Sequence, residues 1–432
     1  MPSRTLTLTI DRLSYGPAGV GRADGKAVFV PGTVPGDEVE VALDEEKKTY
    51  ATGSVMALRH PSPHRRLPPC PYVQRCGGCP WQQVAYAEQL RAKETLVREH
   101  MRRIGGLTDP PVLPIIPSPQ EWHYRHRIRL RAEDNARLGF YQASSHELVE
   151  IESCLIAGEN VADHLRVVRA WLASLRTPVR RVELVTGEPA RGPASPGVVL
   201  VGNAEGAFDP EDEIACRHFL ATYPHVGLVL FGRGWRRTWG ETQTSCDLGI
   251  EGLTLTVSQG AFTQVNLAAN RALIAALLRL SDAQKEQRVI ELYCGAGNLS
   301  LPLARRVRSL IGIEQDRTAV ADARANAARA GLTNTRFVCA PARVGVRDLR
   351  RAGVQGDVVV LDPPRAGAAE VIDEVPRLGA QMVIYVSCDP ATLARDLRRL
   401  HAHGYQVRAL QPLDLFPHTY HVETIAVSVL TC

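Results

Sequence analysis

The chain has 432 residues, of which 45% are hydrophobic and 22% charged, a composition typical of globular proteins that excludes wholesale disorder. At about 150 residues per domain this length predicts roughly three domains, and ten cysteines are too few for a disulfide-stapled secreted scaffold. The net charge of +5 is only mildly basic and does not by itself indicate a nucleic-acid partner. The first residues alternate threonine and leucine, unlike a signal peptide, and no window approaches the roughly 18 apolar residues of a membrane span. We therefore expect a cytoplasmic protein without a membrane partner.

Short strand patterns separated by turns fill residues 1–58. Polar and apolar residues alternate over 5–10 and 38–43, and glycine- and proline-rich turns separate these stretches from an apolar run at 27–30. Several short strands in under sixty residues predict a compact all-β barrel of the oligonucleotide-binding kind. The runs Gly-Val-Gly-Arg at 19–22 and Val-Pro-Gly-Thr-Val-Pro-Gly-Asp at 30–37 resemble the TRAM domain, a small RNA-binding barrel. The resemblance implies contact with RNA, whereas a generic barrel would serve only for packing.

Residues 59–255 form a predicted central domain of mixed, mostly β structure. A proline- and arginine-rich linker over 60–69 precedes a helix expected at 85–104, whose apolar residues recur at helical spacing. This helix packs either within the central domain or on the C-terminal domain. Five prolines between 110 and 119 prevent it from continuing, and short strands with one helix near 161–175 are predicted up to residue 255.

Three cysteines of the central domain lie within ten residues, and two of them flank a pair of glycines that allows a tight loop. They are Cys70, Cys76 and Cys79, and the more distant Cys154 could complete a set of four. The scarcity of cysteine elsewhere argues against chance clustering. Four thiolates suit either a tetrahedral zinc ion or a [4Fe–4S] cluster, and the spacing alone does not choose between them.

Arginine occupies every second position from 125 to 131. In a strand, Arg125, Arg127, Arg129 and Arg131 share one face. Four adjacent guanidinium groups repel one another, and a polyanion would relieve that repulsion. Because no acidic residue interrupts the run, we expect these arginines to contact RNA phosphates rather than to form a solvated face paired with acids.

Helical and strand patterns alternate from about residue 256, which predicts a doubly wound, Rossmann-like α/β domain over 256–432. An apolar strand at 288–292 runs into the turn 293–298 (Tyr-Cys-Gly-Ala-Gly-Asn), and Glu314 ends the next strand, where a ribose hydroxyl would be bound. A nicotinamide-binding turn normally carries a third glycine, which this turn lacks, and Asp362 with two prolines ends a later strand instead. This combination resembles the S-adenosylmethionine (SAM)-dependent methyltransferase fold. The resemblance implies that Glu314 binds the ribose and that Gly295 lets the backbone approach the methionine part.

Cys388 follows a predicted strand at 382–387 and sits in the polar turn Ser-Cys-Asp-Pro. Ligands of open α/β sheets bind at the carboxyl ends of the strands, so we expect Cys388 near the SAM methyl group, whereas Cys294 is interpreted as a core residue. A methyltransferase needs a thiol when its target is a pyrimidine C5, because thiolate addition at C6 activates C5. A base must then remove the C5 proton, and Glu423, in an apolar closing segment, is the candidate.

Three motifs in the last third of the chain resemble the RNA (uracil-5-)-methyltransferase family. They are Asp-Pro-Pro-Arg-Ala-Gly at 362–367, Ser-Cys-Asp-Pro-Ala-Thr-Leu-Ala-Arg-Asp at 387–396 and Asp-Leu-Phe-Pro-His-Thr-Tyr-His-Val-Glu at 414–423. The resemblance implies that Cys388 is the nucleophile and Glu423 the general base. The SAM-binding residues that it implies, with two added from the glycine turn, are Gln264, Tyr293, Gly295, Asn298, Glu314 and Asp362. The cysteine pattern is similar to the [4Fe–4S] site of bacterial rRNA-modifying members, which implies the ligands Cys70, Cys76, Cys79 and Cys154.

The expected organisation is a TRAM-like barrel (1–58), a central iron–sulfur and RNA-binding domain (59–255) and a SAM-dependent methyltransferase domain (256–432). The resemblance implies methylation of uridine C5 in RNA by a monomeric enzyme. The barrel and the cysteine cluster favour 23S rRNA as substrate, since tRNA-specific bacterial members of the family are typically shorter and lack both. One alternative is a tRNA uracil-5-methyltransferase. A second is an RNA cytosine-5-methyltransferase, which usually carries a cysteine where this chain has Arg365. The third is a catalytically idle RNA-binding protein with a relic methyltransferase fold.

Overall fold

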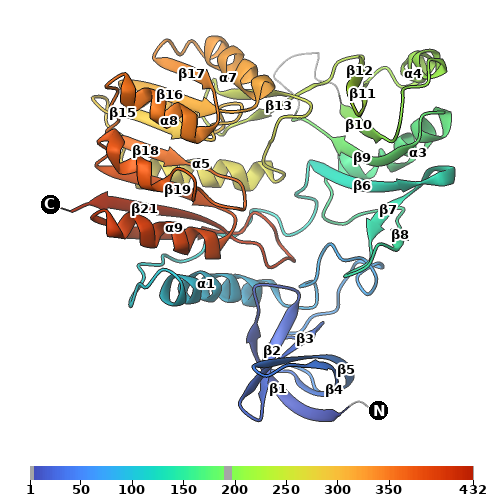
Figure 1. The fold of residues 1–432 in the computed structure, drawn as a ribbon. Helices are drawn as coiled ribbons and strands as arrows, with labels where there is room; N and C mark the ends of the chain where they lie inside the picture. The colour runs from blue at the N-terminus through green and yellow to red at the C-terminus, as the bar shows by residue number, and fades with distance from the viewer. Residues whose placement is uncertain (1–3, 189–196, 432) are drawn as a thin grey trace.

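The computed structural model describes residues 4–188 and 197–431, which form a barrel, a central sheet and an α/β domain (Figure 1). The N-terminal strands close into a five-stranded barrel in the order β1-β2-β3-β5-β4, which confirms the predicted barrel. Its core is built from alternating apolar residues such as Ile10, Val30 and Val39. Gly21 lets β1 and β2 approach, since a Cβ there would lie 2.6 Å from the carbonyl oxygen of Thr9. The strands are β1 (Thr5–Leu13), β2 (Ala18–Ala23), β3 (Lys26–Pro31), β4 (Glu38–Glu46) and β5 (Tyr50–His60).

Helix α1 (Tyr86–Arg103) lies between the barrel and the C-terminal domain (Figure 1). Its bounds agree with the helix expected at 85–104. Glu88 in its first turn and Arg103 in its last turn complement the helix dipole. Val97 and Met101 are fully buried and belong to the hydrophobic core of the C-terminal domain. The helix therefore packs on a domain from which the whole central sheet separates it in sequence.

The central domain is a seven-stranded sheet in the order β12-β11-β10-β9-β6-β7-β8. Its apolar core includes the fully buried Trp171 of α3. The helix expected at 161–175 corresponds to α2 and α3. The sequence did not predict the further helix α4, because only Cys216 and Phe219 of its apolar residues are buried. The elements are β6 (Arg127–Glu133), η1 (Asp134–Ala136), β7 (Arg137–Tyr141), β8 (Leu148–Glu150), α2 (Glu159–Ala162), α3 (Leu165–Ser174), β9 (Val179–Val185), β10 (Val198–Ala204), α4 (Glu211–Thr222), β11 (Val226–Gly232) and β12 (Trp235–Trp239).

The C-terminal domain contains a second seven-stranded sheet, ordered β17-β16-β15-β18-β19-β21-β20, with helices on both faces (Figure 1). All its strands run parallel except β21, which is antiparallel to both of its neighbours. The predicted doubly wound α/β fold is confirmed. A hairpin and this domain comprise β13 (Gln243–Asp247), β14 (Thr254–Ser258), α5 (Leu267–Ser281), β15 (Arg288–Leu292), α6 (Ser300–Ala304), β16 (Ser309–Glu314), α7 (Arg317–Arg329), β17 (Thr335–Cys339), α8 (Ala342–Arg351), β18 (Val358–Leu361), η2 (Ile372–Leu378), β19 (Met382–Ser387), α9 (Pro390–Ala402), β20 (Tyr405–Leu413) and β21 (Glu423–Leu430).

The strand order of this sheet reverses between β15 and β18. The carboxyl ends of the strands beside such a reversal are where open α/β sheets bind their ligands. The glycine turn that follows β15 and Asp362, which follows β18, both lie at that edge. Within residues 4–188 and 197–431, none of the helices is long and apolar enough to cross a membrane.

Candidate active site

The turn after β15 brings together several residues that were expected to bind SAM. Tyr293, Gly295 and Gly297 all have positive φ angles, so the backbone doubles back at the end of the strand. The Gly295 amide donates a hydrogen bond to Glu314 Oε2 at 3.2 Å, which joins the turn to the end of β16. The Tyr293 hydroxyl donates to Glu370 at 3.2 Å. The turn and the Glu314 carboxylate thus form one continuous polar edge.

Two other candidate SAM contacts are held by partners that the sequence did not reveal. Asn298 exchanges two amide hydrogen bonds with Asn270 of α5, at 2.8 and 2.9 Å, so its side chain is fixed by a neighbouring helix. Gln264 is buried in the loop before α5. His126 holds this loop, because its backbone amide and ring Nδ1 lie 3.0 and 2.8 Å from the carbonyl oxygen of Val265.

Cys388 occupies the turn between β19 and α9. Asp389 caps the helix by accepting hydrogen bonds from the amides of Ala391 and Thr392, at 3.0 and 2.9 Å, and this fixes the turn. Burial, followed by the charge of Glu423, raises the pKa of the Cys388 thiol to about 12, although Arg365 acts in the opposite direction through its charge and a hydrogen bond. The resting thiol is therefore neutral at physiological pH, and Arg365 is the group that favours the thiolate.

The pairing of β19 with β21 ends beside Cys388 and Glu423. Ser387 and Thr424 form the last pair of the antiparallel ladder, Cys388 follows Ser387, and Glu423 precedes Thr424. The charge of Glu423 raises the pKa of the Cys388 thiol, so the two side chains lie close together. Glu423 is only 3% exposed, and burial, followed by the charge of Asp362, raises its pKa well above the ordinary value. A carboxylate with a raised pKa is matched to accepting a proton near neutral pH.

Asp362 completes this group from the end of β18, the strand beside β19. Burial raises the pKa of its carboxyl to about 7, and its charge acts on both Cys388 and Glu423. Three acidic groups from three neighbouring strands therefore meet next to the glycine turn. A cation at this position would stabilise their ionised forms.

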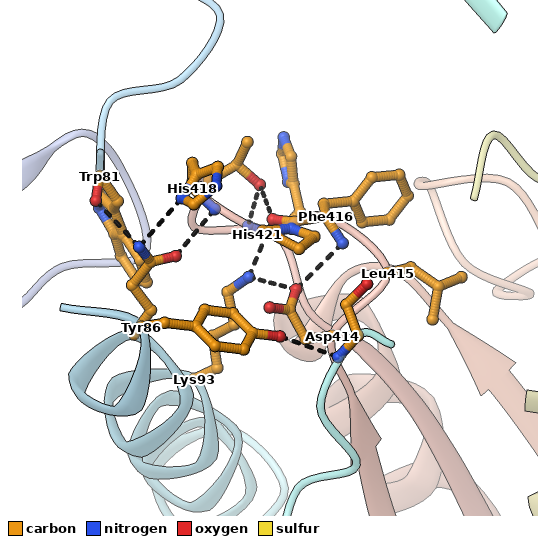
Figure 2. Close-up of polar contacts among 12 residues, drawn as sticks. Trp81, Tyr86, Lys93, Asp414, Leu415, Phe416, His418 and His421 are labelled. Atoms are coloured by element: carbon orange, nitrogen blue, oxygen red, sulfur yellow. Dashed lines mark hydrogen bonds and ion pairs between the residues drawn. The ribbon is translucent and has the colours of Figure 1, made fainter. Parts of the chain in front are cut away.

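The segment that leads to Glu423 is anchored by α1, as Figure 2 shows. The ammonium of Lys93 lies 2.6 Å from Asp414 Oδ1 and donates to the carbonyl of Phe416 at 3.0 Å. Gln89 Oε1 accepts a hydrogen bond from the amide of His418 at 2.8 Å. Both side chains of the Lys93–Asp414 pair are fully buried. Sequence reasoning missed this anchor, and its one signal was Lys93 itself, four residues before Val97 on the apolar face of the helix.

The four cysteines of the central domain line one cavity of about 270 Å³. Burial, followed by the charges of nearby thiols, raises the pKa of Cys76, Cys79 and Cys154, that of Cys79 to about 12. In the part of the chain that the structure describes, no group of three histidine, cysteine, aspartate or glutamate side chains is arranged to hold a metal ion. The thiols thus share one cavity.

The expectation that four arginines share a free face is wrong. The strand β6 begins only at Arg127, and Arg125 precedes it, pairing its backbone with Ile156 and Gly158 while its side chain lines the cysteine cavity. Among the described residues, its buried Nε has no hydrogen-bond partner. Arg125 therefore faces the thiols rather than solvent.

Arg127 and Arg129 share one acidic partner, which lies on a neighbouring strand. Glu183 of β9 pairs with Arg127 at 2.6 Å and with Arg129 at 3.1 Å. Arg127 also donates to the carbonyl of Ala261 at 3.2 Å and so supports the loop of Gln264. The side chain of Arg129 is 65% exposed, whereas the guanidinium of Arg131 lies 4.5 Å from the ring centre of Tyr141.

Comparison with known proteins places this site in a family. Residues 242–429 match the model for tRNA (Uracil-5-)-methyltransferase, and residues 1–56 match the TRAM domain. The chain is 36% identical to the 23S rRNA (uracil(1939)-C(5))-methyltransferase RlmD of Pectobacterium atrosepticum, over 99% of this chain and 94% of the relative. It is 35% identical to an uncharacterized RNA methyltransferase of Gloeobacter violaceus, over 99% and 96% of the two chains.

A solved structure shares the fold along nearly the whole chain. The tRNA (uracil-54, C5)-methyltransferase of Pyrococcus abyssi, in complex with S-adenosyl-L-homocysteine, aligns with a TM-score of 0.72 at 23% identity, covering 98% of this chain and all of that one. This match shows the fold, and the full-length relatives confirm the family that the three sequence motifs indicated. The chain belongs to the RNA (uracil-5-)-methyltransferase family and carries its TRAM domain.

Proposed function

We propose that this enzyme methylates uridine C5 in 23S rRNA through a covalent bond between Cys388 Sγ and uracil C6. The observation that carries the proposal is the meeting of Cys388, Glu423 and Asp362 at the ends of three neighbouring strands beside the glycine turn. The relative named RlmD supports 23S rRNA as the substrate.

Each step of the proposed reaction falls to a side chain in this group. The Cys388 thiol first loses its proton to solvent, and the resulting thiolate, favoured by Arg365, forms the Sγ–C6 bond while the C5=C6 electron pair moves so that C5 becomes nucleophilic. SAM supplies the methyl group when bound. Glu423 then takes the C5 proton, the C5=C6 double bond forms again, and Sγ leaves with the electron pair of its bond to C6.

We propose that SAM is held by the residues that line the edge of the sheet. Glu314 faces the ribose, and the Gly295 turn, which already donates to Glu314, lets the backbone approach the methionine part. The sulfonium charge is matched by Asp362, whose raised pKa a neighbouring cation would lower. The remaining contacts of this proposal are Gln264, Tyr293 and Asn298.

The four cysteines are proposed to hold a [4Fe–4S] cluster with a structural role. Their shared cavity of about 270 Å³ leaves room for a multi-atom cluster, and Arg125 lines the same cavity as a counter-charge. The chemistry of methyl transfer needs no electron from the cluster. The ligands are Cys70, Cys76, Cys79 and Cys154.

Iron analysis tests the cluster directly. Protein purified without oxygen should contain about four irons per chain, as expected for four thiolate ligands, and absorb broadly in the visible range. Cys76→Ser should lose the iron and the colour, whereas Cys246→Ala, at a buried cysteine outside the cavity, should keep both. Colourless protein with stoichiometric zinc would contradict the proposal.

Transfer of labelled methyl groups tests the substrate. Protein incubated with radiolabelled SAM and 23S rRNA should place the label in 5-methyluridine, and rRNA from a deletion strain should lack one methyl group by mass spectrometry. Label found only in tRNA would assign the enzyme to tRNA. Label in 5-methylcytidine would assign it to cytosine, and the absence of transfer to any RNA would indicate a protein that only binds RNA.

A further inference from the structure

The first turn of the barrel reaches the turn that carries Cys388. The hydroxyl of Tyr15, between β1 and β2, donates to the carbonyl oxygen of Cys388 at 3.2 Å and lies 3.4 Å from Asp389 Oδ2. These two acceptors flank the peptide that joins the nucleophile to the cap of α9. A residue 373 positions away in sequence therefore contacts the backbone of the candidate nucleophile.

The ring of Tyr15 sits between two other elements of the site. It meets His100 of α1 edge to face, with ring centres 5.5 Å apart, and it meets Tyr420 of the segment before Glu423 in the same way, also at 5.5 Å. Tyr15 thus touches the turn of the thiol, the segment of the base and the helix that anchors this segment.

The turn that carries Tyr15 is itself held rigidly. The indole of Trp81 is fully buried and donates to the carbonyl of Gly16 at 3.0 Å. Ser14 closes the turn, since its backbone amide and its hydroxyl both donate to the carbonyl of Ala18, at 2.9 and 2.7 Å. Burial raises the pKa of the Tyr15 hydroxyl, so it remains a donor across the physiological range.

We propose that Tyr15 is a positioning residue for Cys388, so that the barrel completes the catalytic centre in addition to contacting RNA. The hydrogen bond from the hydroxyl fixes the Cys388 carbonyl, and a fixed backbone at this residue fixes the direction in which its thiol points. RNA seated on the barrel and the nucleophile that attacks it are then parts of one rigid unit. The inference rests on the proposed role of Cys388.

Tyr15→Phe removes the hydroxyl and keeps both ring contacts, and Tyr50→Phe is the matched control, since Tyr50 packs on Phe29 within the same barrel. RNA carrying 5-fluorouridine traps the covalent adduct, because fluorine at C5 cannot leave as a proton. With Tyr15→Phe we expect kcat and the rate of adduct formation to fall about tenfold, the value of one hydrogen bond, with KM for RNA, SAM affinity and Tm unchanged. The control should match the wild type in every measurement.

Three results would overturn the inference. A Tyr15→Phe enzyme that forms the adduct at the wild-type rate shows that the hydroxyl does not position the thiol. A higher KM with unchanged kcat assigns Tyr15 to RNA binding alone. Wild-type enzyme that methylates uridine but forms no adduct refutes the proposed role of Cys388, and this inference fails with it.

Discussion

Replacing Lys93 by methionine should destabilise the protein by about 3–5 kcal/mol, the cost of leaving one charge of a buried pair without its partner. Both side chains of the pair are fully buried. Asp414 Oδ1 also accepts a hydrogen bond from the amide of Phe416 at 3.0 Å, but this donor carries no charge and does not replace the ammonium. Burial lowers the pKa of Lys93, and the charge of Asp414 opposes that shift, so each group of the pair stabilises the ionised form of the other. A loss of this size is a large part of the roughly 5–15 kcal/mol by which domains are stable.

Urea denaturation followed by circular dichroism measures this loss. The double variant Lys93→Met with Asp414→Leu should recover most of it, because it removes both charges and fills the site with apolar atoms. Arg91→Met is the matched control on the same helix, since Arg91 is 59% exposed and pairs with Glu88 at the surface, and it should cost at most about 1 kcal/mol. A Lys93→Met protein within 1 kcal/mol of the wild type, with additive effects in the double variant, would refute the reasoning.

Three further predictions concern catalysis, protonation and RNA. Glu423→Gln should accumulate a methyl-labelled protein–RNA adduct, because proton removal fails after addition, and this adduct should migrate slowly on a denaturing gel. Cys388→Ala should form neither adduct nor product. Normal turnover by Glu423→Gln would exclude Glu423 as the base. Burial raises the pKa of Glu291 from 4.5 to about 8, so the folded state binds this proton more tightly than the unfolded state does. As the pH rises from 4.5 to 8, the free energy of unfolding should therefore fall by up to about 1.4 kcal/mol per pH unit. Glu291→Gln should flatten that slope, measured by urea unfolding at pH 5, 6.5 and 8, and an unchanged slope would mean that the carboxyl does not titrate in this window. Arg129→Ala should weaken RNA binding and reduce the slope of its salt dependence by about one. Arg217, whose side chain is similarly exposed, is the control, and Arg217→Ala should change neither quantity. Equal binding of both variants at every salt concentration would show that Arg129 does not contact RNA.

The sequence predicts those parts of the site that depend on local pattern. Cys388 could be singled out because an apolar strand ends there in a polar turn, and the doubly wound fold follows from alternating helix and strand patterns. The register of β19 and β21, which brings Glu423 beside Cys388, could not be predicted from the sequence, because pairing between strands leaves no local signal. The same limit explains the wrong expectation for the arginines, since the acid of Arg129 lies 54 positions away on β9.

The Lys93–Asp414 pair also constrains the order in which the enzyme becomes active during its synthesis. Its two residues are 321 positions apart, so at about 5–20 residues per second the ribosome delivers Asp414 roughly 16–64 s after Lys93. During that interval the buried face of α1, with Val97 and Met101, has no methyltransferase sheet to cover it. Exposed apolar surface on a partly made chain favours aggregation, so a chaperone that covers α1 would protect the nascent chain. The segment that leads to Glu423 can close onto α1 only after Asp414 has been made, so the candidate active site forms late in synthesis.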